Sequence, residues 1–533
     1  MYDIIIKNGL VVDGVLSPGF VADVCVKDGI VAEIGGGGDS ALEIIDATGL
    51  VVAPGFVDSH THSDKSAFFG SDAYNYLEQG VTLQIAGQCG SSPAPFGGRE
   101  DMTISWGTGF GPDEAKQAAE WAMTPESFMR RAKEVAHGTN LAFLIGHGAL
   151  RNSAMGYADT KATPEAMAHM EDLIRRAMEC GFFGYSSGLS YAPSAYGDTA
   201  ELTRLAEVMA PYGGVYATHM RSEGDKGVEG VVEAIEIAER AGVTLVISHL
   251  KTVGKANEGN SVKYFELIEA AVRRGVSVYA DQYPFTASSA PLSSQIPVKY
   301  HVGGVKALLE RLADASTRSE IWQAIQARSN NFESSLYTAG PSGILVVGAP
   351  KSPDYIGKTI AALAEEQNKS PFDAFCDLLL QNDGQGAGIY FSQNESDMMR
   401  ILPHPRVMGG SDWSDISVRQ NPEHVAGGHP RGMATFPRRL QLLRDHKLLS
   451  LEEAVQSITS RTAIAHGIKD HGVLKTGKAA NITVFDHKTI GAAADFLHPF
   501  RRNTGIHSVI VNGQTAVRSG VATGVRAGVL VSR

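Results

Sequence analysis

The sequence predicts an α/β fold: a TIM-type (β/α)8 barrel, with a small β-domain built from both termini and an inserted subdomain between the last two barrel strands. This expectation rests on the strand pattern in the middle of the chain, on the two ends of the chain and on one long stretch between strands. Apolar segments recur eight times, helical patterns separate several of them, and polar residues stand at their carboxyl ends. Short alternating segments with Gly-rich turns occupy both ends of the chain, and one stretch is too long for a βα connection.

Each of the eight candidate strands is apolar enough to be covered on both faces, as parallel strands are. In chain order they are LVVAPGFVDSH (50–60), GVTLQIAGQC (80–89), LAFLIGHG (141–148), FFGYSSG (182–188), GVYATHM (214–220), VTLVISH (243–249), VSVYADQYP (276–284) and PRVMGGSD (405–412). A doubly wound open sheet would show the same local pattern. The number of strands and their polar carboxyl ends favour the closed barrel.

Helix signals lie between these strands. Thr163 and Pro164 suit the N-cap and first position of a helix that ends at Gly181. Apolar residues at helical spacing predict further helices over about 228–241 and 262–274, each followed by glycine.

The division into domains follows from the same patterns. Residues 1–52 and 470–533 are predicted to form the two parts of the small β-domain, and residues 53–469 the barrel. The insert is expected over about 285–406, which contains helical patterns of its own.

Composition limits the possible partners. A formal net charge of -11 over 533 residues argues against binding to nucleic acid. No run of about 18 apolar residues suggests a membrane span, and the first residues suit a strand better than a signal peptide, so a cytoplasmic protein is expected. Four widely spaced cysteines make a disulfide framework improbable. Nothing in the sequence defines an oligomeric state.

The polar residues at the strand ends predict a metal site, because the carboxyl ends of barrel strands meet at one cavity. His60 and His62 follow the first strand, Cys89 the second, and His219 and His249 the fifth and sixth. His219 and His249 are one βα unit apart, which places them at the same height on neighbouring strands. A mixture of nitrogen and sulfur ligands favours zinc over magnesium or calcium.

Several of these residues also have ordinary structural interpretations. An isolated His-x-His pair can cap a strand, and a lone cysteine is often a small buried hydrophobic residue. His147 closes the third strand and is either structural or a support for the site. Asp281 and Asp412 both close strands and compete for the role of acid/base.

Seven motifs carry a family resemblance: GFVDSHTHSD, GQCGSSPAP, HMRSEG, ISHLK, ADQYPFTASS, GGSDWSD and HPRGMATFPR. Together they resemble the N-acyl-D-amino-acid deacylases (D-aminoacylases) of the amidohydrolase superfamily, over nearly the whole chain. The resemblance implies that Cys89, His219 and His249 hold one tightly bound zinc ion, with His60 and His62 at an adjacent, weaker site. It also implies that Asp412 is the catalytic acid/base. The fourth strand ends without the lysine that bridges two metals in many superfamily members, which agrees with a cysteine in that role.

The expected reaction is hydrolysis of a linear amide. Zinc activates water and polarises the carbonyl, and Asp412 moves the proton to the leaving nitrogen. The free carboxylate of an N-acyl amino acid needs a partner, and the resemblance points to Lys251 with Tyr191. Ser289 and Arg221 are weaker candidates, and Tyr283 could bond the carbonyl oxygen.

The expected substrate has a neutral or apolar side chain, because no arginine is identifiable as the partner of a second carboxylate. Trp413 after the GSD motif and the segment SDKSAFFGS after His62 depart from the family pattern near the pocket rim. Preference for the D enantiomer comes from the resemblance alone. The alternatives are a related amidohydrolase acting on a cyclic amide, carbamoyl compound or dipeptide, and a non-catalytic scaffold, which retention of all the polar strand ends disfavours.

Overall fold

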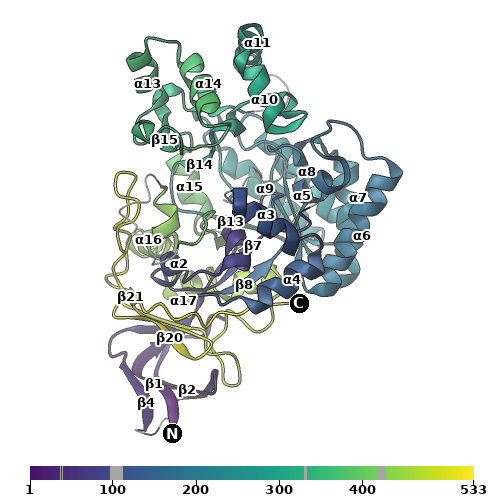
Figure 1. Ribbon diagram of the computed structural model, residues 1–533. Coiled ribbons are helices and arrows are strands. Elements are labelled where there is room, and N and C mark those ends of the chain that lie inside the picture. The colour runs from purple at the N-terminus through teal and green to yellow at the C-terminus, as the bar shows by residue number, and fades with distance from the viewer. Residues whose placement is uncertain (37, 39, 97–111, 329–332, 417–427) are drawn as a thin grey trace.

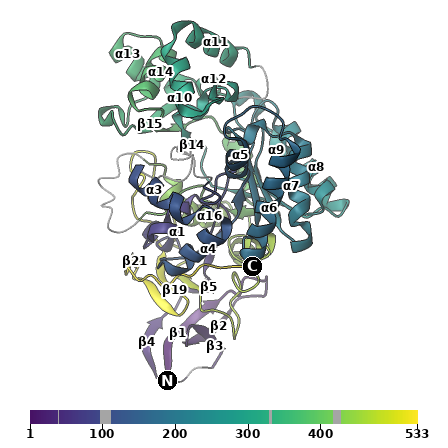
Figure 2. The ribbon, with the colours of Figure 1, turned by 45° about the vertical axis from the view of Figure 1, so that its right-hand side comes forward.

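The computed structural model describes residues 1–36, 38, 40–96, 112–328, 333–416 and 428–533. Figures 1 and 2 show three regions: a group of helices at the top, a barrel in the middle, and a sheet at the bottom that contains the N-terminus. No helix within these ranges is long and apolar enough to cross a membrane.

Eight parallel strands form the barrel, the third of them in two pieces. They are β6 (Phe56–Asp58), β7 (Val81–Ala86), β8 (Asn140–Phe143) with β9 (Ile145–Gly146), β10 (Gly184–Gly188), β11 (Val215–His219), β12 (Thr244–Ile247), β13 (Val278–Gln282) and β17 (Val407–Gly409). Each strand is paired in parallel with the next. The barrel closes between its first and last strands, where the Ser59 N–H donates to the Gly409 carbonyl (3.1 Å) and the Asp412 N–H to the His60 carbonyl (2.8 Å).

The predicted barrel helices are confirmed, with small shifts at their ends. Helix α6 (Pro164–Cys180) begins after Thr163, whose side chain accepts a hydrogen bond from the Ala166 N–H, and it ends at the left-handed Gly181. Helices α8 (Gly227–Ala241) and α9 (Asn260–Arg273) occupy the other two predicted ranges. The remaining longer helices around the barrel are α3 (Pro112–Trp121), α4 (Pro125–Glu134), α5 (His147–Met155), α7 (Thr199–Met209) and α16 (Arg431–Asp445).

The first candidate strand is divided, contrary to the single strand expected over 50–60. Its first half is β5 (Val51–Pro54), which pairs with strands of the terminal sheet, and only its second half enters the barrel as β6. Gly55 lies at the division, where a Cβ atom would stand 2.1 Å from the Thr82 hydroxyl oxygen. A glycine is needed at this position because the chain passes too close to Thr82 for any larger residue.

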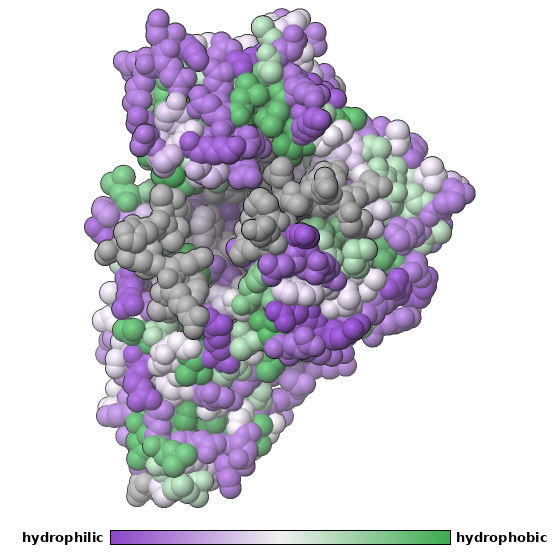
Figure 3. Space-filling view, viewed as in Figure 1, coloured by the Kyte–Doolittle hydropathy of each residue, from purple (hydrophilic) through white to green (hydrophobic). Residues whose placement is uncertain are grey.

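Strands from both ends of the chain form one nine-stranded sheet. Its order is β21-β20-β19-β18-β5-β1-β2-β3, and β4 also pairs with β1. The bounds are β1 (Tyr2–Val11), β2 (Phe20–Lys27), β3 (Ile30–Ile34), β4 (Ala41–Asp46), β18 (Ile482–Phe485), β19 (Ile506–Val511), β20 (Gln514–Arg518) and β21 (Val521–Ala522). Val21, Leu42 and Ile44 are exposed large hydrophobic residues of this sheet, and Figure 3 shows hydrophobic residues gathered at this end of the molecule.

The segment between β13 and β17 has its own sheet and core. Strands β14 (Ser288–Pro291), β15 (Ile344–Gly348) and β16 (Ala387–Tyr390) form an antiparallel sheet in the order β14-β16-β15. Four longer helices accompany it: α10 (Gly304–Ala313), α11 (Ala315–Gln326), α13 (Ile360–Gln367) and α14 (Pro371–Gln381). Their apolar faces share one buried cluster that includes Leu308, Ile321 and Phe375. In Figure 1 these helices stand above the barrel.

Candidate metal centre

Six polar residues meet at the carboxyl ends of the barrel strands. His60 and His62 follow β6, Cys89 follows β7, His219 ends β11, His249 follows β12 and Asp412 follows β17. Each is at most 6% exposed. The predicted metal-site residues are therefore close together in space, although they come from five different strands.

Three of these residues have a left-handed backbone, which is unusual for residues other than glycine. The φ angles are 53° at Cys89, 36° at His249 and 53° at Asp412. Such strain persists only where the surroundings hold the residue in place, and it concentrates at functional sites. Close packing contributes at Cys89, because a Cβ atom on Gly188 would stand 2.1 Å from the Cys89 carbonyl oxygen.

Cys89, His219 and His249 form the first group of possible ligands. The Cys89 sulfur lies 3.4 Å from Nε2 of His249 and 3.9 Å from Nδ1 of His219. These two ring nitrogens are themselves 2.9 Å apart. Three donor atoms thus lie close together although they come from the second, fifth and sixth strands of the barrel.

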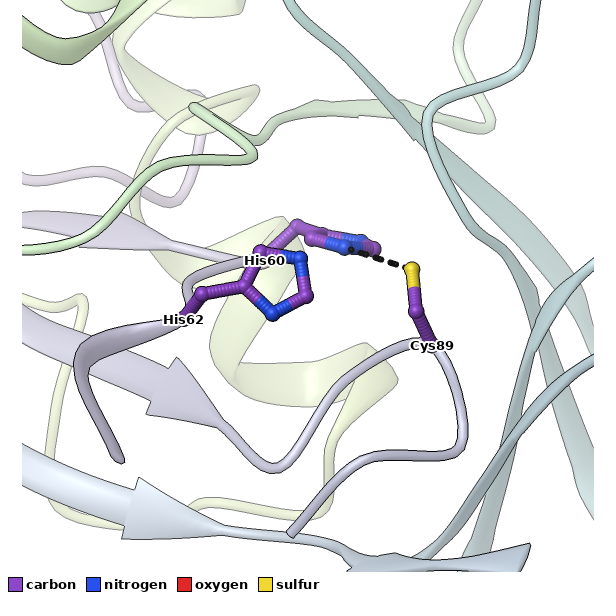
Figure 4. A group of neighbouring side chains, drawn as sticks. All are labelled: His60, His62 and Cys89. Atoms are coloured by element: carbon purple, nitrogen blue, oxygen red, sulfur yellow. Dashed lines mark hydrogen bonds between the residues drawn. The ribbon is translucent and has the colours of Figure 1, made fainter. Parts of the chain in front are cut away.

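His60, His62 and Asp412 extend the cluster on its other side. The Cys89 sulfur also lies 3.4 Å from Nε2 of His60, the contact drawn in Figure 4. One oxygen of Asp412 lies 3.1 Å from Nε2 of His62 and 3.5 Å from Nε2 of His60. Cys89 therefore belongs to two groups of possible ligands, one with His219 and His249 and one with His60 and His62.

The donor set fits zinc. Ligand atoms on one tetrahedral zinc ion lie about 3.3–3.6 Å apart, given Zn–S distances of about 2.3 Å and Zn–N distances of about 2.0–2.1 Å. The separations among Cys89, His219 and His249 run from 2.9 to 3.9 Å. One thiolate with two imidazoles is a typical zinc ligand set, whereas magnesium and calcium prefer oxygen.

The cluster favours the deprotonated forms of Cys89 and Asp412. Burial alone raises the pKa of the Cys89 thiol, but the imidazoles of His60, His249 and His219 lower it well below its ordinary value. Burial also raises the pKa of Asp412, and the positive charge of Arg431 with the neighbouring histidines more than reverses this. A thiolate and a carboxylate are the forms that bind a metal cation.

Asp281 supports the cluster from below. Its carboxylate accepts hydrogen bonds from the His249 N–H (2.7 Å) and the Ser59 hydroxyl (3.3 Å), and it lies 3.5 Å from Nδ1 of His60. The residue is fully buried. Asp281 therefore holds the candidate ligands His249 and His60 in place.

Lys251 is buried beside the cluster and is already paired. Its ammonium group donates to Glu223 (2.5 Å) and lies 2.8 Å from Nδ1 of His249. Burial lowers the pKa of Lys251, but Glu223 outweighs it and the net pKa is raised. The same carboxylate lies 3.1 Å from Nδ1 of His249. Glu223 therefore connects His249, a candidate metal ligand, to Lys251, the candidate partner of the substrate carboxylate.

A pocket of about 750 Å³, measured out to its mouth, opens beside the cluster and is called the charged pocket below. Its walls include His219, His249 and Asp412, and all five predicted substrate-binding residues: Lys251, Tyr191, Tyr283, Ser289 and Arg221. The Tyr191 ring packs edge-on against His219, with centroids 4.7 Å apart. The Tyr283 hydroxyl is hydrogen-bonded to Gln393 (2.8 Å).

Two of the candidate partners for the substrate, Arg221 and Ser289, form hydrogen bonds with other residues of the protein. The Arg221 guanidinium bonds the Glu233 carboxylate (2.9 Å) and the carbonyls of Ala195 and Gly197. The Ser289 carbonyl accepts a hydrogen bond from Arg431 (3.1 Å), and Ser289 is one of the residues that line the charged pocket.

Sequence reasoning missed Glu223 and Arg431. Arg431 is 2% exposed and donates to the second oxygen of Asp412 (2.7 Å). Both residues lie inside motifs that carried the family resemblance, HMRSEG and HPRGMATFPR. Membership in these motifs was the one feature of the sequence that could have identified them as site residues. His147 lies outside the cluster: its ring contacts the Ser194 hydroxyl (2.8 Å) and Glu201 (2.9 Å).

The chain resembles known proteins along its whole length. The Amidohydrolase family matches residues 43–517. A D-aminoacylase of Alcaligenes xylosoxydans xylosoxydans is 32% identical over 536 residues, covering 100% of this chain and 98% of the relative.

Two solved structures align over 100% of both chains. One is the N-acyl-D-glutamate deacylase of Bordetella bronchiseptica in complex with zinc and a phosphonate inhibitor that mimics the tetrahedral intermediate, 28% identical with a TM-score of 0.81. The other is a D-aminoacylase with a binuclear metal centre, 32% identical with a TM-score of 0.82, in which one metal activates and the second attenuates.

Proposed function

Because the chain belongs to the amidohydrolase family, we propose that it is a zinc-dependent enzyme that hydrolyses the amide bond of N-acyl-D-amino acids. The products are a carboxylic acid and a D-amino acid. The observation that carries the proposal is the convergence of Cys89, His219 and His249 next to Asp412, at a pocket that contains Lys251. The substrate class rests on the relatives, a D-aminoacylase and an N-acyl-D-glutamate deacylase.

Cys89, His219 and His249 hold the tightly bound zinc ion in this proposal. Their donor separations and the lowered pKa of Cys89 support the assignment. His60 and His62 border a second, weaker site, which agrees with the binuclear metal centre of a D-aminoacylase relative. When bound, zinc supplies the Lewis acidity that activates water and polarises an amide carbonyl.

Asp412 is the proposed catalytic acid/base. It accepts the proton of the attacking water and delivers it to the leaving nitrogen as the amide bond breaks. One carboxylate oxygen faces the histidine cluster, and Arg431 holds the other. This leaves a single oxygen directed at the reacting groups, in a fixed orientation.

The substrate carboxylate is proposed to bind Lys251, with Tyr191, Tyr283 and Ser289 around it. Lys251 is the cation of the charged pocket closest to the candidate ligands, 2.8 Å from a His249 nitrogen. Arg221 is the weaker candidate, because its guanidinium is occupied by Glu233.

A neutral substrate side chain follows from the charges of the pocket. Identities of 32% with a D-aminoacylase and 28% with an N-acyl-D-glutamate deacylase differ too little to decide the matter. Among the described residues lining the charged pocket, both cations already face carboxylates: Lys251 faces Glu223, and Arg221 faces Glu233. With the main-chain carboxylate of the substrate at Lys251, a second substrate carboxylate would have only Arg221 as a cationic partner, and it would have to displace Glu233.

The domain division is proposed as the sequence predicted it. Residues 1–52 and 470–533 form one small β-domain, and about 285–406 form a subdomain inserted into the barrel. The strand order of the terminal sheet and the separate core of the insert support this division.

The test compares metal content and turnover in the wild type and in Cys89→Ala. The substrates are N-acetyl-D-methionine and N-acetyl-L-methionine, and Cys180→Ala serves as the matched control because Cys180 lies on α6, outside the ligand groups. We expect the wild type and the control to hold about one tightly bound zinc and to release only D-methionine. Cys89→Ala should lose both properties.

Zinc binding without cleavage of either enantiomer would overturn the substrate assignment and direct the search to cyclic amides, carbamoyl compounds and dipeptides. Unchanged zinc content in Cys89→Ala would overturn the ligand assignment.

A further inference from the structure

A second pocket meets the charged pocket at the metal centre. It has a volume of about 840 Å³, measured out to its mouth, and is called the apolar pocket below. Its hydrophobic walls are Ala149, Ala192, Pro193, Ile296, Val298 and Val305. Ser190, Tyr191 and Ser294 line both pockets. The two cavities therefore share one boundary.

The two pockets differ in charge and in the part of the metal centre they reach. No Asp, Glu, Lys or Arg is among the described residues that line the apolar pocket, whereas Arg221, Glu223, Lys251, Glu333 and Asp412 line the charged one. Cys89 lines only the apolar pocket, and His219, His249 and Asp412 line only the charged pocket. The candidate ligands thus stand between an uncharged and a charged cavity.

The covalent structure of the substrate assigns its two halves to these cavities. In an N-acyl amino acid the carboxylate and the side chain share one carbon atom, on the nitrogen side of the scissile amide. The acyl chain leaves the carbonyl carbon in the other direction. With the carboxylate at Lys251, the amino acid half occupies the charged pocket, and the acyl chain points past Cys89.

We propose that the apolar pocket binds the acyl chain of the substrate, and that this chain is aliphatic and longer than acetyl. The inference rests on the proposed function and adds the chemical class of the acyl group. Moving methylene groups from water to apolar walls stabilises the bound substrate, and each methylene beyond the acetyl group adds to this stabilisation.

The apolar pocket is built from two regions that are each held in place. Gly148 and Ala149 begin α5 on the barrel side, where the Ala149 N–H donates to the Gly90 carbonyl (3.3 Å). The buried His147 contacts Ser194 (2.8 Å) and Glu201 (2.9 Å), which braces the loop after β10. A preformed cavity loses little ordering entropy when a chain enters it.

The insert supplies the opposite wall. Ile296 lies just before the 3-10 helix Val298–His301, Val298 is the first residue of that helix, and Val305 lies in the first turn of α10. His301, a further wall residue, contacts the Ile296 carbonyl (3.1 Å) through Nε2, and burial lowers its pKa to about 4. This wall is therefore uncharged at neutral pH, which suits a hydrocarbon chain.

The test is a series of N-acetyl-, N-butanoyl-, N-hexanoyl- and N-octanoyl-D-methionine with the zinc-loaded enzyme. We expect kcat/KM to rise about fourfold for each methylene buried, the equivalent of ~0.8 kcal/mol, until the pocket is full. Equal or falling kcat/KM beyond acetyl would overturn the inference.

Val305→Phe narrows the apolar pocket, and Val298→Phe does so independently should the first variant fold poorly. We expect at least tenfold lower kcat/KM for the hexanoyl substrate and a value within twofold of wild type for the acetyl substrate. Val302→Phe is the matched control, because Val302 lies on the same segment but outside the pocket lining. This control should keep the wild-type dependence on chain length.

Two further results would overturn the inference, and they can be told apart. A Val305→Phe enzyme that changes its preference among D-amino acid side chains at constant acyl group would assign the apolar pocket to the side chain and overturn the inference. Failure of the wild type to hydrolyse any N-acyl-D-amino acid would instead remove the proposed function, and the inference with it.

Discussion

At the scale of single residues, the candidate metal centre is held by its neighbours against the preferences of its own backbone. A left-handed φ in a residue other than glycine costs on the order of 1–3 kcal/mol, and Cys89, His249 and Asp412 all adopt one. Hydrogen bonds fix two of them: the His249 N–H donates to Asp281, and the Asp412 N–H donates to the His60 carbonyl. The donor atoms are thereby oriented before any ligand binds.

Asp412→Asn tests the acid/base assignment at this scale. Asparagine keeps the shape of the side chain and an oxygen for Arg431, but it cannot carry the proton. We expect kcat to fall by about 10²–10⁴, while zinc content stays at the wild-type value because Cys89, His219 and His249 are untouched. Steady-state kinetics and metal analysis on the same preparation check both expectations. Wild-type kcat would exclude Asp412 from proton transfer.

Lys251→Met tests the carboxylate partner. The wild type should prefer N-acetyl-D-methionine over its carboxamide by about 10- to 100-fold in kcat/KM, since a hydrogen bond to a charged group is worth about 1.5–3 kcal/mol. The variant should lose this preference.

A Lys251→Met/Glu223→Gln double variant is the control. It is needed because the single change leaves the buried Glu223 carboxylate without its Lys251 partner. Persistence of the preference in the double variant would assign the substrate carboxylate to another residue.

The sequence allowed the ligand candidates to be predicted because strand ends are visible in a pattern of apolar runs. His60, His62, Cys89, His219, His249 and Asp412 all follow such runs, and the structure places them together. Glu223 and Arg431 lie in loops or at a helix start, away from any strand end. Their positions depend on how loops fold over the barrel, which local periodicity does not record.

At the scale of elements, helix ends follow local chemistry closely. Thr163, Pro164 and Gly181 predicted both ends of α6, and the structure has a side-chain cap from Thr163 and a left-handed Gly181. Helices were predictable because capping is a property of a few neighbouring residues.

Thr163→Ala removes this cap. We expect the free energy of unfolding to fall by about 1 kcal/mol, with unchanged kinetic constants, as measured by urea denaturation and assay. Thr160→Ala is the control, since Thr160 is exposed in the preceding loop and its side chain caps no helix. An equal loss in both variants would contradict the capping assignment.

His301→Gln tests how the insert responds to pH. Burial, assisted by Arg311, lowers the pKa of His301 from 6.5 to about 4 in the folded protein, although its contact with the Ile296 carbonyl opposes this. The unfolded chain takes up the proton near pH 6.5 and the folded protein only near pH 4. The stability due to neutral His301 is thus complete above pH 6.5 and is lost as the pH falls toward 4.

Glutamine keeps a donor for the Ile296 carbonyl and cannot be protonated. Between about pH 6.5 and 4 the wild type should therefore lose up to about 1.4 kcal/mol more per pH unit than His301→Gln. Denaturation curves at pH 7, 5.5 and 4.5 measure the difference. Parallel pH profiles would show that His301 is protonated in the folded protein as well.

Strand boundaries were less predictable than helix ends. The run over 50–60 reads as one strand, yet it divides at Gly55 between two sheets, at the point where Thr82 approaches the backbone. That approach is a long-range contact. A pattern of apolar residues predicts that a segment is buried, but it does not show which sheet the segment joins.

At the scale of the whole molecule, barrel closure creates the site. Asp412 and His62 are 350 positions apart and come to 3.1 Å because the first and last strands are neighbours. The barrel class was predictable from strand number and order. The shapes of the charged and apolar pockets were not, because both depend on where the insert rests against the barrel loops.

Zinc titration of the metal-free protein tests whether one zinc ion per chain makes the enzyme active on an N-acyl-D-amino acid. Hydrolysis of N-acetyl-D-methionine and of its L enantiomer is measured at increasing zinc-to-protein ratios. We expect no activity without metal, a rise in D-enantiomer hydrolysis that is complete at about one zinc per chain, and no hydrolysis of the L enantiomer. Full activity in the metal-free protein, or equal cleavage of both enantiomers, would contradict this expectation.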